Sequence, residues 1–546
     1  MYKGFKRGLL LSMVLTFAAS LVLSGCGAGS GKGMADRQVF RMNLGTEPPT
    51  MDPGMAQDNV SFTVLWAIFE GLTRLDKEGK PVPAVAKSWD ISGDQVTYTF
   101  HLRDDVKWSN DQPVTAQDFE FAWKRVLNPE IASPNASQLY YLKGAEDYNA
   151  GKTADPDSIG VKAADDHTLI VTLAAPTPYF ISLTSSVAYM PLNKKSVESG
   201  GEWASDAGTI VTNGPFLLAE WKHNDSIVLK KNPKYFEASK VKMQEVDMSM
   251  IGEASTSASM FEAGQLDWNG TPTGEIPTDL IPKLKTDGSL HTQGQASIYY
   301  YMFNVTQKPF DNAKIRKALS MSINREELVA NVTKGGQIPA FGFVTPGIAG
   351  DRQTFREEHP ESGYFKEDAE QAKQLLAEGL KDEGLDKLPE ITLSYTTSEN
   401  HKKIAEAIAD MWKRNLGIDV KLQNQEWKVF LETLQSKNYQ IATAGWFADY
   451  DDPNTFLDIF TSGSGNNATG FSNSEYDKLI KDASHETDTK KRLDELAQAE
   501  KLLIADQMVV IPIYYYASLW QQNEKVKDVY IDWQGNIHFT QGYFAK

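Results

Sequence analysis

Asp449 is the residue in this 546-residue sequence whose setting most favours specific chemistry. It follows the strand-like run 442–446 within a few residues, and the neighbouring Trp446 and Phe447 could keep water away from it. A carboxylate in such a place is a good partner for an ammonium group, because a charge-assisted hydrogen bond strengthens as water is excluded. The alternative is an aspartate that caps the turn before Pro453. The residue pattern alone leaves both interpretations open.

Motifs of catalytic and metal sites are absent or incomplete. The eight histidines include no H-x-x-x-H or H-E-x-x-H spacing, and no G-x-S-x-G occurs. Residues 29–33 imitate a phosphate loop but lack the Ser or Thr after the lysine, and the acidic run 449–452 lacks the glycine of a calcium loop. We therefore expect that the protein binds no cofactor and no metal and that it is not an enzyme. A surface hydrolase, for which the many acidic residues and tryptophans would be suited, or an adhesin stays as the alternative from another class.

Alternating strand and helix patterns place Asp449 at the end of a sheet. They predict a strand at 391–395, a helix at 401–415, a strand at 418–422, a helix at 427–435 and a strand at 439–446. This order predicts a parallel sheet covered by helices, in which ligands bind beyond the carboxyl ends of the strands. Asp449 lies just past one of those ends.

The N-terminal half also mixes strands and helices. Residues 97–102 alternate like a strand, and Thr115 with Asp118 forms a capping box that opens a helix ending near residue 127. Strands are expected at 216–221 and 226–230. The fold class is therefore α/β, and the length allows two to four domains.

The first residues predict export. Lys3, Lys6 and Arg7 precede an apolar stretch from 9 to 23, which is too short to span a membrane and suits a signal peptide. The following 23–26 segment, Leu-Ser-Gly-Cys, resembles the lipobox of bacterial lipoproteins. We expect a signal peptide at 1–25, lipidation at Cys26 and a flexible Gly-rich tether at 26–38. An ordinary secretory signal with an incidental cysteine is the alternative.

Charge and cysteine content exclude several classes. Cys26 is the only cysteine, so no internal disulfide can form. The formal net charge is −17, and residues 1–25 contain three basic and no acidic residues, so the processed chain is more acidic still. Such a surface repels nucleic acid and anionic lipid. Membrane attachment must then come from the lipid.

Motifs along nearly the whole mature chain resemble those of bacterial oligopeptide-binding proteins, the family 5 extracellular solute-binding receptors of peptide importers. The matching segments keep the family's order, at 69–72, 86–89, 107–110, 113–116, 118–123, 213–214, 232–235, 316–319, 425–427, 444–453 and 513–516. The resemblance implies a type II periplasmic-binding-protein-like fold of three domains, with two lobes that close on the ligand. It implies domain I at 39–69, 194–296 and 517–546, domain II at 70–193 and domain III at 297–516.

The same resemblance implies a peptide site. An aspartate at the position of Asp449 binds the α-amino group of an extended peptide, which pairs its backbone with protein strands. By position, main-chain groups would come from Gly445, Phe447 and Asn59, and side-chain pockets would be lined by Trp427, Trp446 and Tyr515. His401 matches one partner of the peptide carboxylate in the family.

Three positions depart from the family pattern. Thr443 and Leu434 stand where members carry arginines, and Asn135 stands where they carry a tyrosine. Preferred peptide length therefore cannot be transferred from the family. Either His401 or Lys402 suffices as a partner for the peptide carboxylate, or longer peptides are favoured.

The implied function is that of a monomeric, lipid-anchored receptor on the extracytoplasmic face of the cell membrane. It would bind short peptides and deliver them to the permease and ATPase subunits of an ABC importer. A same-fold receptor for a murein peptide, a signalling peptide, nickel or an oligosaccharide remains the alternative.

Overall fold

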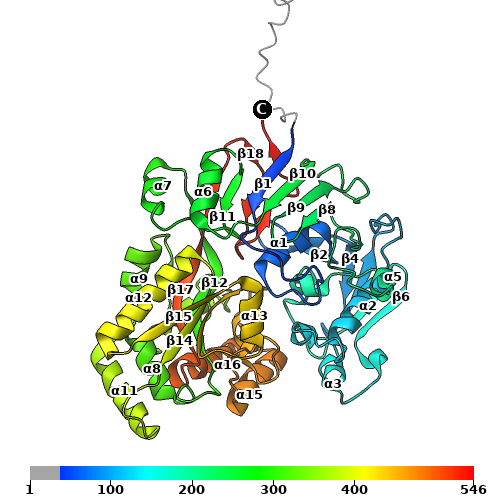
Figure 1. The fold of residues 1–546 in the computed structure, drawn as a ribbon. Helices are drawn as coiled ribbons and strands as arrows, with labels where there is room; N and C mark the ends of the chain where they lie inside the picture. Colours follow the sequence, from blue (N-terminus) through cyan, green and yellow to red (C-terminus); the bar gives the residue numbers. More distant parts are fainter. Residues whose placement is uncertain (1–36) are drawn as a thin grey trace, which may run out of the picture.

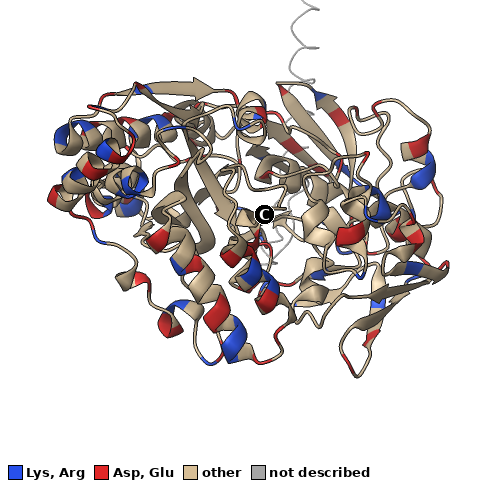
Figure 2. Cartoon of the chain, turned by 90° about the horizontal axis from the view of Figure 1, so that it is seen from below, with Lys and Arg blue, Asp and Glu red and all other residues tan. Residues whose placement is uncertain are grey.

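The computed structural model describes residues 37–546, so the predicted signal peptide, Cys26 and most of the predicted tether fall outside the described residues. Among the helices of residues 37–546, none combines the length and the apolar content that a membrane span requires. Acidic and basic residues are interspersed over the helices and loops of the surface (Figure 2).

Three sheets organise the chain, and each has a different connectivity. The first has the order β1 (Val39–Asn43), β10 (Glu245–Ser249), β9 (Ser226–Lys231) and β8 (Phe216–Lys222). The second has the order β4 (Ala86–Ile91), β5 (Thr97–Leu102), β7 (Thr168–Thr172) and β6 (Val161–Asp165), all antiparallel. The third has the order β11 (Trp268–Gly270), β17 (Val510–Gln522), β12 (His291–Phe303), β16 (Ile441–Phe447), β14 (Ile391–Thr396) and β15 (Val420–Gln425), with β13 (Ile338–Pro339) beside β17.

The principal helices lie against or between these sheets (Figure 1). They are α1 (Asn59–Ile68), α2 (Ala116–Leu127), α6 (Ala254–Glu262), α7 (Ile281–Asp287), α8 (Ala313–Met321), α11 (Ala369–Asp382), α12 (Glu399–Leu416), α13 (Trp427–Gln435), α15 (Ser474–His485) and α16 (Thr489–Lys501).

Local sequence signals account for several of these boundaries. The predicted capping box is present at α2, where the Thr115 backbone N–H donates to the Asp118 carboxylate at 2.9 Å. Gly417 ends α12 in a left-handed conformation, which glycine adopts without a Cβ clash. The five predicted elements between 391 and 446 all form, each within a few residues of its expected ends.

The third sheet is mixed rather than parallel. β14 pairs in parallel with both β15 and β16, as expected, but β12 pairs antiparallel with β16 and with β17. β12 and β17 are 13 residues long, and their register is interrupted between Gly294 and Ile298. In Figure 1 these two strands run from the upper part of the molecule into the lower left part. They form the hinge strands between two lobes.

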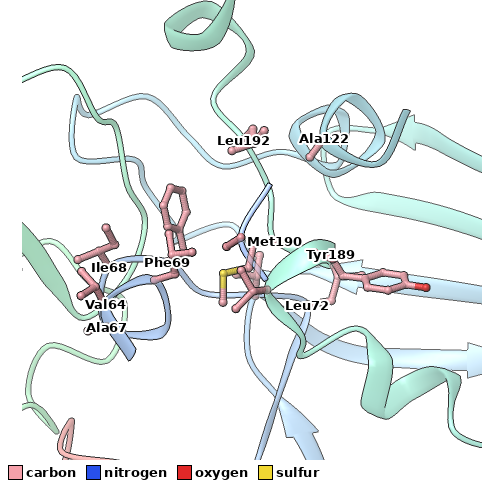
Figure 3. Packing of buried hydrophobic residues seen from close by; sticks show 14 of the residues in the cluster. Val64, Ala67, Ile68, Phe69, Leu72, Ala122, Tyr189, Met190 and Leu192 are labelled. Carbon is pink, nitrogen blue, oxygen red and sulfur yellow. The ribbon is translucent and has the colours of Figure 1, made fainter. Parts of the chain in front are cut away.

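The buried apolar residues divide in the same way. One cluster joins residues 40–268 with the C-terminal 526–544 and also contains Tyr450, so the first and second sheets share a core. Figure 3 shows part of it, where Phe69 and Leu72 pack near Met190 and Leu192. Two other clusters draw nearly all their residues from 296–515. We call the unit around the first core the first lobe and the unit around the other two the second lobe. The finer division into three domains stays a proposal.

Candidate functional site

A cavity of about 730 Å³ lies between the two lobes. The first lobe lines it with residues from 43–62, 135–138 and 251–281, and the second lobe lines it with residues from β12, β14, α13 and β16 and with the loop 464–468. Its position beyond the carboxyl ends of β14 and β16 is where the sequence pattern predicted a ligand.

Asp449 lies in this cavity, half-buried, and its carboxylate has no cationic partner. Its backbone N–H donates to Thr455 Oγ1 at 2.9 Å, which fixes the segment, but among residues 37–546 no ion pair or hydrogen bond to its side chain occurs. Burial raises the pKa of Asp449 to about 7, because desolvation disfavours the charged form. A cationic group from a ligand would restore the lost stabilisation.

Beside Asp449, one edge of β16 is open. β14 pairs with β16 only at Ile441 and Ala442, whereas β12 pairs with β16 along its whole length. The Ala448 N–H donates to Ala296 O at 2.9 Å, so the even-numbered residues of β16 bond toward β12. Since backbone groups alternate along a strand, Gly445 and Phe447 point their N–H and C=O groups toward the open edge. An extended chain could pair there.

The first lobe presents the N-terminus of α1 to the same cavity. Asp58 caps this helix by accepting hydrogen bonds from the Val60 and Ser61 N–H groups, both at 3.0 Å, and Asn59 is the first helical residue. Both line the cavity together with Trp427 of the second lobe. Burial raises the pKa of Asp58, and hydrogen bonds from Ser61 and Val60 counteract that rise.

Aromatic side chains form much of the remaining wall, and one expectation about them is corrected. Of the three aromatic residues expected to line side-chain pockets, Trp427 and Trp446 are among the lining residues, but Tyr515 is not; its neighbours Tyr514 and Tyr516 are. Tyr515 points to the opposite face of β17, where its hydroxyl donates to Glu361. Successive side chains of a strand point to opposite faces of the sheet, so Tyr515 faces away from Tyr514 and Tyr516. A sequence run of three tyrosines does not show which of the two faces meets the cavity.

His401 also lines the cavity, but its surroundings do not favour an anion. Its Nδ1 lies 2.6 Å from Thr396 Oγ1, and its Nε2 lies 3.9 Å from a carboxylate oxygen of Glu275. Burial lowers the pKa of His401, so the ring is mainly neutral at pH 7. A ligand carboxylate placed beside Nε2 of His401 would be repelled by the nearby carboxylate of Glu275.

The cavity lining is acidic overall. Asp58, Glu275, Glu426 and Asp449 line it, and Lys437 is the one Lys or Arg among the described residues that does. The three departures from the family pattern, Thr443, Leu434 and Asn135, are all lining residues and add no charge. Glu275 and Lys437 were missed from the sequence, because no motif marks either residue.

Side chains of the two lobes touch along the rim of the cavity. Thr46 Oγ1 donates to Glu426 at 3.1 Å, and Gln435 Nε2 donates to Gln57 Oε1 at 2.7 Å. These bonds join segments more than 370 residues apart in the sequence. The lobes are therefore closed over the cavity.

A family model described as bacterial extracellular solute-binding proteins, family 5 middle, matches residues 80–468. The chain belongs to this family. Among its relatives, the oligopeptide-binding protein OppA of Bacillus subtilis is 46% identical, covering 99% of each chain. The dipeptide-binding protein DppE of Bacillus subtilis is 42% identical, covering 95% of this chain and 96% of its own.

Solved structures confirm the fold prediction. The substrate-binding domain of an oligopeptide ABC transporter from Bacillus anthracis matches with a TM-score of 0.89 at 34% identity, covering 94% of this chain and all of its own. The murein tripeptide-binding protein MppA of Escherichia coli matches with a TM-score of 0.87 at 35% identity, covering 94% and 99%. The unliganded open form of MppA matches with a TM-score of only 0.62, covering 95% of this chain and 99% of its own. The identity is the same, so the lower score reflects the lobe arrangement. This family 5 chain is not in that open arrangement.

Proposed function

We propose that this chain is an extracytoplasmic receptor that binds short peptides and passes them to an ABC importer. Family membership and the peptide-binding relatives support the receptor class. The observation that carries the peptide assignment is the half-buried, unpaired Asp449 carboxylate beside the open edge of β16. An extended peptide supplies both missing partners, a terminal ammonium for the carboxylate and backbone groups for the edge.

The mechanism is binding followed by closure. The ammonium pairs with Asp449, the backbone joins Gly445 and Phe447 as an added strand, and the α1 end at Asn59 contacts the same chain from the first lobe. Closure is favourable because the ligand contacts both lobes at once. Side chains would lie in cavities lined by Trp427 and Trp446, where water can bridge different groups. No covalent step is part of this mechanism, and we propose that the protein is not an enzyme.

The test is calorimetry of protein stripped of ligand by unfolding and refolding. Titrations with peptides of three to five residues should give saturable binding, whereas nickel and oligosaccharides should not bind. A free murein tripeptide in the same panel separates general peptide uptake from murein recycling. Absence of binding to every peptide would refute the proposal, and peptide cleavage detected by mass spectrometry would refute the claim that it only binds.

The lipid anchor is a separate proposal, supported by the 23–26 segment. In a bacterial host, the mature wild-type chain should carry a diacylglyceryl mass at Cys26 and fractionate with membranes. Cys26→Ser should lose that mass and appear in the extracytoplasmic soluble fraction. Equal membrane association of both forms would contradict anchoring through Cys26.

A further inference from the structure

Three tyrosines meet across the two lobes, directly beside the segment that carries Asp449. Tyr141 and Tyr179 belong to the first lobe. Tyr450 follows Asp449 on the segment after β16 of the second lobe, and its ring is buried in the core of the first lobe. The rings of Tyr179 and Tyr450 are stacked, with centroids 4.2 Å apart and planes 11° apart. The ring of Tyr141 stands edge-on to Tyr179 at 5.6 Å and 86°. Aromatic pairs favour both arrangements.

Polar contacts tie the same side chains together. The hydroxyl oxygens of Tyr141 and Tyr450 lie 3.0 Å apart, and Asn454 Nδ2 donates to them at 3.1 Å and 2.9 Å respectively. Asp458 Oδ2 accepts from the Tyr141 hydroxyl at 3.3 Å and from Asn454 Nδ2 at 3.2 Å. Tyr450 and Asn454 are each only 3% exposed. Such polar groups need partners when they are buried.

These contacts depend on the closed arrangement. Tyr141 and Tyr450 are 309 residues apart in the sequence and sit in lobes that the hinge strands β12 and β17 connect. Rotation of the lobes about that hinge would separate Tyr141 and Tyr179 from Tyr450. It would expose the Tyr450 ring and remove the Tyr141 donor from Asp458. The cluster therefore stabilises the closed state and not the open one.

The cluster also fixes the ligand-binding carboxylate. Tyr450 is covalently next to Asp449, and Thr455, which accepts from the Asp449 N–H, directly follows Asn454 of the cluster. Movement of Tyr450 away from the first lobe would displace the turn that holds Asp449. Lobe closure and the position of Asp449 are thus mechanically linked.

We propose that Tyr141, Tyr179 and Tyr450 form a cross-lobe latch. The latch holds the Asp449 segment in its ligand-binding position and slows release of the bound peptide. The latch rests on the proposed peptide-binding function and assigns Tyr141 and Tyr179 as positioning residues, because they act through the Asp449 segment. It predicts an effect on dissociation rather than on association, since the contacts form only after the lobes close.

The first experiment measures association and dissociation of a fluorescent tetrapeptide by stopped flow in Tyr141→Phe and Tyr179→Leu. Loss of the hydroxyl contacts or of the stacked ring should speed dissociation about three- to tenfold and leave association within about twofold. Tyr140→Phe is the matched control, because the Tyr140 hydroxyl donates to Asn149 inside the first lobe at 2.6 Å. Its dissociation rate should equal that of the wild type.

The second experiment follows closure without a ligand. In a Cys26→Ser chain, Lys152→Cys and Lys478→Cys place one dye on an exposed site of each lobe. Energy transfer should report a smaller closed fraction in Tyr141→Phe than in its parent. A dissociation rate within twofold of wild type together with an unchanged closed fraction, in variants that unfold at the wild-type temperature, would overturn the latch. A wild type that binds no peptide would instead refute the proposed function, and the energy-transfer result would still decide the latch.

Discussion

At the scale of single residues, the proposed function depends on one carboxylate, Asp449, whose charged form is disfavoured by burial. Burial holds the pKa of Asp449 near 7, and no described cation offsets it. A bound ammonium would favour the charged form and lower that pKa. The protein thus keeps a half-buried acid ready for an external partner, at some expense in the stability of the unliganded form.

This pKa predicts a pH dependence of binding. Below pH 7 the free carboxyl is mostly protonated and must lose its proton to pair with an ammonium, so affinity should fall at most about tenfold per pH unit. Above about pH 8 the peptide amine loses its own proton, so affinity should fall again. Calorimetry at pH 6 in buffers of different ionisation enthalpy should show release of close to one proton per peptide.

Asp449→Asn serves as the control for that experiment, because it keeps the neighbouring Asp458, whose pKa burial also raises to about 7. In the Asp449→Asn variant, peptide affinity should no longer fall as the pH drops below 7. Proton release that is unchanged in Asp449→Asn would assign the titration to Asp458 instead.

The charge of the cavity wall predicts that the two ends of a peptide contribute unequally. The amine meets an unpaired carboxylate, whereas the wall offers Lys437 as its one Lys or Arg and a mainly neutral His401. Blocking the amine of a tetrapeptide by acetylation should therefore reduce affinity at least about tenfold more than amidating its carboxylate. Binding isotherms of the two blocked peptides, each compared with the free peptide, test this. Equal losses would show that a carboxylate partner has been overlooked.

At the scale of elements, we propose that the peptide backbone pairs with the open edge of β16. Gly445→Pro removes an N–H that β12 does not use, so it should weaken peptide binding by about 1–3 kcal/mol without breaking the sheet. Gly445→Ala is the control for added bulk, since its Cβ would lie 3.3 Å from Tyr516 Oη. Calorimetry of both variants, with thermal unfolding alongside, separates the two effects. If both bind peptide equally well, main-chain pairing at Gly445 is not used.

Other polar contacts serve stability alone. Asp118 accepts from the Thr115 N–H at 2.9 Å and from Trp108 Nε1 at 3.1 Å, and none of these three residues lines the cavity. Asp118→Ala would leave a buried indole N–H without its acceptor and should lower the free energy of unfolding by about 1–3 kcal/mol. Denaturant unfolding measures this, and peptide affinity should be unchanged. A comparable loss of affinity would mean that the first lobe couples to the cavity in a way the contacts do not show.

The sequence predicted these elements unevenly, for physical reasons. Capping boxes, glycine ends and helical periodicity are local signals, and they located α2, α12 and the strands from β14 to β16. The antiparallel pairing of β12 and β17 depends on contacts between residues about 220 positions apart, which no local pattern encodes. The same limit explains Tyr515, because strand alternation is visible in a sequence but the face that meets the ligand is not.

At the scale of the whole molecule, the proposed mechanism uses two lobes joined by β12 and β17 to convert binding into a change of shape. The closed arrangement buries the cavity and brings Thr46, Gln57 and Tyr141 into contact with the second lobe. Small-angle scattering of ligand-stripped protein should show a larger radius of gyration than the peptide complex, because an unliganded chain lacks the contacts that favour closure. Identical radii in both states would exclude hinge closure as the signal to an importer.

Pairing between Asp449 and the peptide amine is the contact on which the proposed function depends, and a double-mutant cycle measures that pairing directly. Calorimetry would compare wild type and Asp449→Asn, each with a free tetrapeptide and its N-acetylated form. We expect each single change to cost about 3–5 kcal/mol and the double change to cost little more, giving a coupling energy of at least about 2 kcal/mol. Additive losses, or an acetylated peptide that binds the wild type as tightly as the free one, would contradict the account.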